Sequence, residues 1–404
     1  MTEHTIIRLG HQGDGIADGP VFVPLALPGE VVTGTLDGTK LQDMRVVTPS
    51  ENRVKAPCRH YKACGGCSLQ HASDAFVADW KVDIVRHALS AQGIEADFRP
   101  IETSPANSRR RAVISARRTK KGAMAGFHMR ASDVLTEIPD CQLLHPDLKP
   151  ALGIAEALAI MGASRKGEIS VTATLAPEGL DISVSGGKPL DGPFEAELGI
   201  EAQKLGVARL TWDGEVLATR IPPWQPFGAA KVTPPPGAFL QATREGEDAL
   251  LRAVQEIVGD ASKVADLFAG CGTFSLPLAE NAEVHAVEGE GAMLSALDQG
   301  WRMAKGLKRV TTETRDLFRN PFIAGDLKYD AIVIDPPRAG AEAQCREIAK
   351  SKVTTVAFVS CNPVTFARDA AILIEGGYKL DWVQVVDQFR WSSHIEVVGR
   401  FVRA

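Results

Sequence analysis

The chain has 404 residues, which at about 150 residues per domain predicts two or three domains. Hydrophobic residues make up 45% and charged residues 24%, a balance that excludes disorder as the main state. The formal net charge of -5 does not favour nucleic-acid binding by the chain as a whole, so such a function would need a local basic patch.

No segment predicts a membrane span or a secretory signal. The longest strongly apolar run without charges, Val353–Ala367, has 15 residues, fewer than the roughly 18–20 that a spanning helix needs. The first ten residues contain Glu3, His4 and Arg8 and no apolar core. Seven cysteines, an odd number, argue for a reducing compartment and against a disulfide framework. We therefore expect a cytoplasmic protein.

The first 50 or so residues predict a small barrel or sandwich of strands. Short apolar runs are separated by turns that contain glycine and proline, and no helical period of useful length interrupts them. These runs are Thr5–Leu9, Val21–Val23, Val31–Thr35 and Met44–Val47. The segment is acidic, with six Asp and Glu against three Lys and Arg in residues 1–50.

The middle of the chain predicts a mixture of helix and strand. Apolar side chains recur at helical spacing over Ala72–Gln92, and Gly93 provides a stop. A basic strand is expected at Arg109–Arg118. Two hairpins follow, and their strands are Ile169–Leu175 with Leu180–Ser185, and Ala208–Trp212 with Glu215–Thr219. Six prolines between residues 222 and 236 then indicate a boundary loop.

From about residue 238 the pattern changes to alternating helices and strands. The helix Gln241–Val258 precedes seven strand candidates: Lys263–Phe268, Glu283–Val287, Arg309–Thr314, Asp330–Ile334, Thr354–Val359, Trp382–Val386 and Ile395–Phe401. Helical stretches separate the first five, which predicts a mostly parallel sheet covered on both faces. No helix separates the last two, so we expect them to form an antiparallel hairpin at the edge.

The first turn of this region carries a glycine loop, Asp266-Leu-Phe-Ala-Gly270-Cys-Gly272-Thr-Phe-Ser, where a strand turns into a helix. Glycine there allows a cofactor to approach the backbone closely. Glu288, at the end of the next strand, can accept hydrogen bonds from two ribose hydroxyls, and Asp316 after the third strand can contact an adenine edge. The combination favours a nucleoside without a phosphate chain, such as S-adenosylmethionine (SAM). A structural turn with surface acids is the alternative.

Polar segments follow the next two strands, at the sheet edge where such folds bind ligands. Asp335-Pro-Pro-Arg338 follows the fourth strand, and Ser360-Cys361-Asn362-Pro363 follows the fifth. Cys361 can act as a nucleophile there, and the alternative is a buried small apolar residue. Near the start of the last strand, alternation places His394 and Glu396 on one face. Glu396 can act as a general base, and the alternative is a solvent-facing charge.

A thiol and a carboxylate in one site suit chemistry on a pyrimidine. Carbon 5 of uracil is a poor nucleophile in the intact ring. A thiolate that adds to carbon 6 creates an enolate, and carbon 5 can then attack the sulfonium methyl of SAM. A base must afterwards remove the proton on carbon 5 so that the thiolate can leave. Cys361 and Glu396 fit these two roles, with the thiolate as the attacking species.

Four cysteines show the spacing of metal ligands. Cys58, Cys64 and Cys67 are close in sequence, with Gly65-Gly66 between the last two, and Cys141 follows far along the chain. Thiolate ligands alone suit either zinc or an iron–sulfur cluster, and spacing does not choose between them. A radical-SAM enzyme would have three residues between the first two cysteines, whereas this chain has five.

A basic stretch lies between Glu51 and Arg130, where 15 Lys and Arg face 7 Asp and Glu. Its densest parts are Arg109-Arg-Arg111 and Arg117-Arg-Thr-Lys-Lys121. On an otherwise acidic protein, such a stretch can form a phosphate-binding face for RNA, and the alternative is a solvated charged surface. Phosphate contacts would position RNA without selecting the base.

Taken together, these motifs resemble the RNA uracil-5-methyltransferase family over nearly the whole chain, in particular its RumA/RlmD-type branch, which methylates 23S ribosomal RNA. The motifs are Cys58-x5-Cys-Gly-Gly-Cys67 with Ser-Leu-Gln70-His71, Phe239-Leu-Gln241, Asp266-Leu-Phe-x-Gly-x-Gly-x-Phe274, Asp335-Pro-Pro-Arg-x-Gly340, Ser360-Cys-Asn-Pro363 and His394-x-Glu396. Gly13-Asp-Gly-Ile-Ala17 with Pro28-Gly-Glu30 is similar to the start of a TRAM domain, an oligonucleotide-binding barrel.

The resemblance implies a multidomain α/β protein. A TRAM-like barrel would occupy residues 1–52, a central α+β domain with the cysteines and the basic stretch residues 53–237, and a Rossmann-like SAM methyltransferase domain residues 238–404. It also implies that the helix near 72–92 packs on the catalytic domain.

The resemblance further implies roles for individual residues. Cys361 would be the nucleophile and Glu396 the proton-abstracting base. The SAM site would be lined by Gln241, Phe268, Gly270, Gly272, Thr273, Glu288, Asp316 and Asp335. A four-iron four-sulfur cluster would be held by Cys58, Cys64, Cys67 and Cys141. The target uridine would be flipped into the pocket.

This chain departs from the family in two places, and other functions compete with the favoured one. Thr273 stands where relatives often have Asn, and Phe389-Arg-Trp-Ser-Ser-His394 stands where they often carry Pro-His-Thr-Gly-His.

Ribosomal RNA is the expected substrate and transfer RNA the alternative. A non-catalytic RNA-binding iron–sulfur protein would not need Cys361 with Glu396, and a small-molecule methyltransferase would not need the barrel or the basic stretch. We expect no membrane or obligate protein partner.

Overall fold

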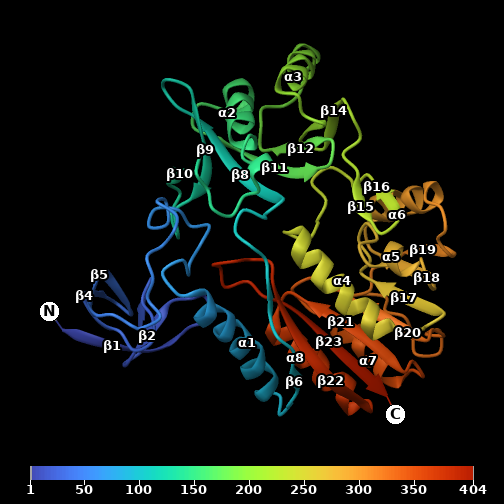
Figure 1. Ribbon diagram of the computed structural model, residues 1–404. Helices are drawn as coiled ribbons and strands as arrows, with labels where there is room; N and C mark the ends of the chain where they lie inside the picture. The colour runs from blue at the N-terminus through green and yellow to red at the C-terminus, as the bar shows by residue number, and fades with distance from the viewer. Residues whose placement is uncertain (1, 404) are drawn as a thin grey trace.

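The computed structural model describes residues 2–403 and contains a closed barrel, a seven-stranded sheet, a short hairpin and a nine-stranded sheet (Figure 1). The barrel is formed by the start of the chain, the seven-stranded sheet by its middle, and the nine-stranded sheet mainly by its last third. Within residues 2–403 no helix combines the length and the apolar character that crossing a membrane requires. The expected multidomain α/β architecture is confirmed.

The barrel closes in the strand order β1-β2-β3-β5-β4. Its strands are β1 (Glu3–Leu9), β2 (Gly15–Ala17), β3 (Val21–Val23), β4 (Val31–Asp37) and β5 (Lys40–Thr48). Four of the five were predicted, and β2 was missed. Ile6, Val23 and Val32 are fully or almost fully buried in its interior. Closure leaves no unpaired strand edge, which lets so small a core support a sheet.

The seven-stranded sheet has the order β10-β9-β8-β11-β12-β13-β14. Its elements are β8 (Arg111–Arg118), β9 (Ala123–His128), β10 (Leu135–Glu137), β11 (Glu168–Ala176), β12 (Gly179–Ser185), β13 (Arg209–Trp212) and β14 (Glu215–Thr219), with the helices η1 (Pro146–Leu148), α2 (Ala151–Gly162) and α3 (Gly192–Leu205). Both predicted hairpins are present, closing at Ala176 with Gly179 and at Trp212 with Glu215.

The proline-rich segment that the sequence indicated as a boundary loop contains a hairpin. Its strands are β15 (Gln225–Phe227) and β16 (Ala230–Val232). Phe227 and Val232 are buried in the core of the nine-stranded sheet, and β16 packs on α6 (Gly291–Met303). A Cβ on Gly300 of that helix would lie only 2.6 Å from Val232, so glycine permits this close approach.

The nine-stranded sheet has the order β19-β18-β17-β20-β21-β23-β22-β6, and β7 pairs with β22. Its strands are β17 (Lys263–Leu267), β18 (Glu283–Glu288), β19 (Val310–Thr314), β20 (Ala331–Ile334), β21 (Thr355–Ser360), β22 (Tyr378–Asp387), β23 (Glu396–Arg403), β6 (Asp97–Phe98) and β7 (Glu102–Thr103). As predicted, the strands β17–β21 are parallel.

The last two strands pair in antiparallel fashion, as predicted, but the prediction that they form the edge of the sheet is wrong. β23 lies between β21 and β22, antiparallel to both, and β6 and β7 extend the sheet beyond β22 in parallel. These short strands come from early in the chain, as does α1 (Asp74–Ser90), which packs on α8 and β22 (Figure 1). The early segment therefore completes the nine-stranded sheet, and the division at residue 237 stays a prediction.

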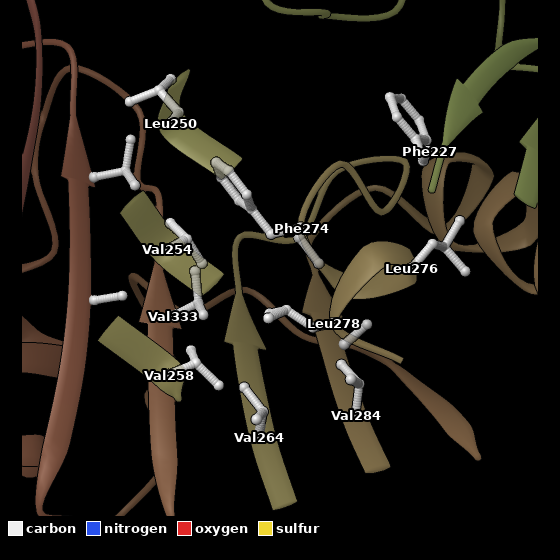
Figure 2. Close-up of a cluster of buried hydrophobic side chains, with 14 of the residues drawn as sticks. Phe227, Leu250, Val254, Val258, Val264, Phe274, Leu276, Leu278, Val284 and Val333 are labelled. Atoms are coloured by element: carbon white, nitrogen blue, oxygen red, sulfur yellow. The ribbon is translucent and has the colours of Figure 1, made fainter. Parts of the chain in front are cut away.

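Helices cover both faces of this sheet. They are α4 (Arg244–Val258), α5 (Ser275–Leu278), α6, α7 (Glu342–Lys350) and α8 (Pro363–Glu375), with α1. Figure 2 shows Leu250, Val254 and Val258 of α4 directed toward strand side chains such as Val264 and Val333. On the other face, Val85 and Leu89 of α1 share a core with α7 and α8. This rigid support fixes the strand ends where the candidate site lies.

Candidate active site

One edge of the nine-stranded sheet gathers most of the predicted site residues. The parallel strands β17–β21 all end at this edge, and the antiparallel β23 begins there. The residues at these strand ends are Phe268, Gly270, Gly272, Thr273, Glu288, Asp316, Asp335, Cys361 and Glu396. Ligands in open α/β sheets bind outside the carboxyl ends of the strands, so this edge is the candidate active site.

The glycine loop and Glu288 are tied together directly. The backbone N–H of Gly270 donates to Oε2 of Glu288 at 3.1 Å. The other carboxylate oxygen accepts from the N–H groups of Gly289 and Glu290 at 2.6 and 3.0 Å. These bonds hold the Glu288 carboxylate at the loop, half-buried, in the place expected for a ribose acceptor.

The backbone of the loop takes conformations that suit close approach of a ligand. Phe268 has φ +63°, a left-handed conformation that costs about 1–3 kcal/mol in a bulky residue and is concentrated at functional sites. Gly272 has φ +93°, and a Cβ there would lie 2.8 Å from Cγ of Leu297 on α6. Thr273 is half-buried in the same turn.

Asp316 orders an aromatic side chain beside the loop. Its Oδ1 accepts from the N–H groups of Phe318 and Arg319 at 3.0 and 3.2 Å. The ring of Phe318 is 48% exposed and lies 5.4 Å from the ring of Phe268, centroid to centroid. The two rings offer an apolar surface for a nucleobase. Sequence reasoning missed Phe318 because no motif marks it.

Cys361 and Glu396 meet at the end of the sheet. Ser360 pairs with Val397 in the antiparallel register of β21 and β23, so the next residues, Cys361 and Glu396, lie opposite each other. Glu396 is only 3% exposed, and burial, reinforced by Asp335, raises the pKa of its carboxyl well above the usual value. Burial, with Glu396 and Asp335 nearby, raises the pKa of the Cys361 thiol to about 11. The structure thus brings together three of the predicted site residues, Cys361, Glu396 and Asp335.

Two carboxyl groups lie between the glycine loop and the cysteine. Burial raises the pKa of Asp266 to about 7, and burial together with Asp266 raises the pKa of Asp335 to about 7 as well. The hydroxyl of Ser275 donates to one oxygen of Asp266, whereas the other oxygen is buried and has no partner among the described residues. A buried orphan acceptor of this kind is suited to a cationic or hydrogen-bonding ligand group.

Gln388 links Gln241 to Glu396. The side-chain oxygen of Gln241 accepts from Nε2 of Gln388, and Oε1 of Gln388 accepts from the N–H of Ala242 at 2.8 Å. Gln388 also hydrogen-bonds to Glu396, which opposes the rise in the pKa of that carboxyl. Gln388 follows β22 and has no sequence motif, so only the folded chain reveals it.

Arg338 and Asn362 link the two polar loops. The Asn362 side chain caps α8 by accepting from the N–H of Val364 at 3.1 Å, and its amide donates to the carbonyl of Arg338 at 2.9 Å. A guanidinium nitrogen of Arg338 lies 3.0 Å from Nδ1 of His394. His394 belongs to the loop before β23, which begins at Glu396, so strand alternation between these two residues was wrongly assumed.

The four predicted ligand cysteines line one small cavity. Cys58, Cys64, Cys67 and Cys141 share its wall with apolar side chains that include Phe127. Backbone N–H groups of Gly66 and Leu143 each donate to a cysteine sulfur at 3.4 Å. Over residues 2–403, no three His, Cys, Asp or Glu side chains have the arrangement needed to hold a single metal ion.

The basic stretch is only partly available to a ligand. Arg110 is buried in an ion pair with Glu247, and Arg117 pairs with Glu168. Arg109 lies over the ring of Phe389, 5.7 Å from its centroid. Arg118, Lys120 and Lys121 are exposed. Only part of the stretch is therefore free to form the predicted phosphate-binding face, because some of its arginines are paired within the fold.

Comparisons with known proteins identify relatives of the whole chain. The tRNA (uracil-5-)-methyltransferase family model matches residues 301–403. An uncharacterized RNA methyltransferase of Brucella suis is 43% identical over 98% of this chain and 96% of its own. The 23S rRNA (uracil(1939)-C(5))-methyltransferase RlmD of Halomonas elongata is 34% identical over 98% of this chain and 88% of its own. The crystal structure of the Pyrococcus abyssi tRNA (uracil-54, C5)-methyltransferase with S-adenosyl-L-homocysteine shares the fold over 99% of both chains, with TM-score 0.78 and 20% identity.

The fold and the relatives together define a SAM-dependent methyltransferase. More specifically, the chain belongs to the RNA uracil-5-methyltransferase family, since the identity to its members runs through nearly the whole length.

Proposed function

We propose that this enzyme makes 5-methyluridine through a covalent bond between Cys361 and carbon 6 of the target uracil, with Glu396 as the base. The observation that carries the proposal is the register of β21 and β23, which sets the thiol opposite the carboxyl at the ligand-binding edge. Bound SAM supplies the methyl group on a sulfonium.

Each residue of the site has a separate role in the proposed reaction. The Cys361 thiolate adds to carbon 6, which makes carbon 5 nucleophilic enough to take the methyl group. The raised pKa of Glu396 makes its carboxylate a stronger base than an exposed one, which suits removal of the carbon 5 proton. Gln388 and Gln241 hold that carboxyl in place.

SAM would bind against the glycine loop. The Glu288 carboxylate would accept from the ribose hydroxyls, and Phe268 and Phe318 would contact the adenine. Asp335 and Asp266 would lie toward the charged methionine end, where an acidic partner is useful. Gly270 would leave room for the nucleoside, whereas Gly272 allows the close approach of Leu297 on α6. Thr273 and Asp316 would complete the rim, and Gln241 is linked to Glu396 through Gln388.

Large-subunit ribosomal RNA is the proposed substrate. The support is the relative whose name specifies uracil in 23S rRNA, which matches at 34% identity over 98% of this chain. Transfer RNA is the alternative, since the matching family model and the similar solved structure carry that name.

The four cysteines are proposed to hold a four-iron four-sulfur cluster. The donor set is entirely sulfur, all four side chains face one cavity, and backbone N–H groups point at two of the sulfurs, as is usual around thiolate ligands. Bound there, the cluster would cross-link the segment 58–67 to Cys141.

The test uses purified enzyme, labelled SAM, and unmodified ribosomal and transfer RNA. Wild type is expected to form 5-methyluridine in ribosomal RNA, Cys361→Ala to form none, and Glu396→Gln to accumulate a covalent RNA adduct on a denaturing gel. Methylation by Cys361→Ala would overturn the nucleophile, and a preference for transfer RNA would replace the substrate. A protein that binds RNA with equal affinity but never methylates would instead be a non-catalytic iron–sulfur RNA-binding protein.

A further inference from the structure

A buried lysine from early in the chain contacts the segment that leads to the base. Lys81 lies on α1, and its side chain has no exposed surface. Its Nζ lies 2.6 Å from Oδ1 of Asp387, the last residue of β22 and itself 1% exposed. A buried ion pair is weak evidence for stability, because apolar side chains of similar shape are often as stabilising. The pair therefore needs another explanation.

The same ammonium group makes two more hydrogen bonds, both to the loop 388–395 between β22 and β23. It donates to the carbonyl of Phe389 at 3.2 Å and to the carbonyl of His394 at 3.0 Å. These acceptors lie near the two ends of the loop, and His394 precedes Glu396 by two residues. With Asp387, the three bonds use all three protons of Lys81, which fixes both ends of the loop to one point on α1.

Neighbouring residues of the early segment hold the middle of the same loop. The N–H groups of Ser68 and Leu69 donate to the carbonyl of Trp391 at 2.8 and 3.0 Å. Arg390 pairs with Asp74 on the first turn of α1 at 2.5 Å. Trp391 itself has φ +61°, a conformation that persists only where surrounding contacts enforce it. Residues 68–81 thus hold the middle of the loop as well as both of its ends.

We propose that Lys81 is a positioning residue, which sets the loop 388–395 so that Glu396 reaches the proton on carbon 5 of the covalent intermediate. The inference rests on the proposed function. In the release step, Glu396 takes that proton, the electron pair of the C–H bond restores the double bond between carbons 5 and 6, and the carbon–sulfur bond breaks to free the Cys361 thiolate. Addition and methyl transfer precede this step and do not use the base.

Loss of Lys81 should therefore slow release more than methyl transfer. The test variant combines Lys81→Met with Asp387→Asn, which removes both charges of the pair. The side-chain oxygen that remains at position 387 can still accept from the N–H of Phe389. Lys81→Arg, which keeps the charge but moves its donors, serves if the double variant does not fold. Arg209→Met with Asp181→Asn is the matched control, because that buried pair lies in the seven-stranded sheet.

The experiment mixes each holoenzyme rapidly with labelled SAM and substrate RNA, and follows labelled protein–RNA adduct and free methylated RNA on denaturing gels. For the Lys81 variants we expect methyl transfer and RNA affinity close to wild type, release slowed by about 100-fold, the size typical of a 1 Å misplacement, and accumulation of methylated adduct. The control pair should accumulate none.

Parallel loss of methyl transfer and release, or release at the wild-type rate, would overturn the role of Lys81. Glu396→Gln is run beside these variants. If it traps adduct while the Lys81 variants do not, the positioning role fails and the proposed function stands. If neither wild type nor Glu396→Gln forms an adduct, the proposed function fails, and the inference fails with it.

Discussion

Cys361 lies opposite Glu396 because β23 runs antiparallel in a sheet whose neighbouring strands are parallel. A parallel strand would have put its first residue at the far edge of the sheet, away from the cysteine. The inserted strand instead brings residue 396 to the edge where residue 361 begins the turn into α8. The carboxyl thus lies on a hydrogen-bonded strand and the thiol directly after the neighbouring one, which is the kind of support that precise chemistry needs.

The reactivity of Cys361 should depend on pH and on Glu396. A pKa of about 11 means that the thiol is mostly protonated at neutral pH, so its alkylation by iodoacetamide should rise steadily toward that pH. Glu396→Gln removes a negative charge that raises this pKa, so the profile should move to lower pH. Mass spectrometry of the Cys361 peptide measures the rate, with Asp381→Asn, distant from the site, as control. An unchanged profile in Glu396→Gln would mean that the two groups do not interact.

Glu288 should contribute to SAM binding. Replacing it by Gln removes the charge that would accept from the ribose hydroxyls, and hydrogen bonds to a charged group contribute about 1.5–3 kcal/mol, so the Kd should rise about 10- to 100-fold. Isothermal titration calorimetry measures the change. Glu290→Gln, two residues along the same loop, should bind like wild type. Equal affinity in both variants would argue against Glu288 as the ribose acceptor.

Arg110 should matter for folding rather than for RNA. Its guanidinium is buried against Glu247, and breaking a buried pair from one side destabilises a protein by about 3–5 kcal/mol. Arg110→Met should lower the free energy of unfolding by that order in urea titrations. Arg86→Met, which breaks an exposed pair with Asp83, should change the free energy of unfolding little.

The exposed basic residues should matter for RNA binding rather than for folding. The double replacement Arg118→Ala and Lys121→Ala should weaken RNA binding in a salt-dependent way without lowering the free energy of unfolding.

The cysteine cavity should hold iron and sulfide. Anaerobically purified wild type is expected to contain both, and Cys64→Ser or Cys141→Ser to lose them. Cys345→Ala, on α7 and outside the cavity, should keep them. Zinc without sulfide in the wild type would contradict the cluster and favour a single-ion site.

Much of the fold could be predicted because its signals are local. Alternating apolar runs and turns marked the barrel strands, the hairpins, and the parallel strands that bring Glu288, Asp335 and Cys361 to one edge. The order of the last strands could not be read, because β6 and β7 are two-residue strands whose partners lie nearly 300 residues away.

The same limit applies to the site. Cys361 and the glycine loop lie in recognisable motifs, whereas Gln388, Phe318 and Lys81 acquire meaning only through tertiary contacts. The extent of the phosphate-binding face could not be predicted for a related reason. The sequence gives the number of basic residues but does not show that Arg110 is buried against Glu247 of α4.

The most direct measurement is the site of covalent attachment to RNA. Substrate RNA carrying 5-fluorouridine at the target position has no proton on carbon 5 for Glu396 to remove, so the reaction should stop after methyl transfer. Digestion and mass spectrometry should then find a methylated fluorouridine attached to the peptide that contains Cys361. Attachment to another residue, or rapid methylation of ordinary RNA with no adduct on the fluorinated one, would contradict the account.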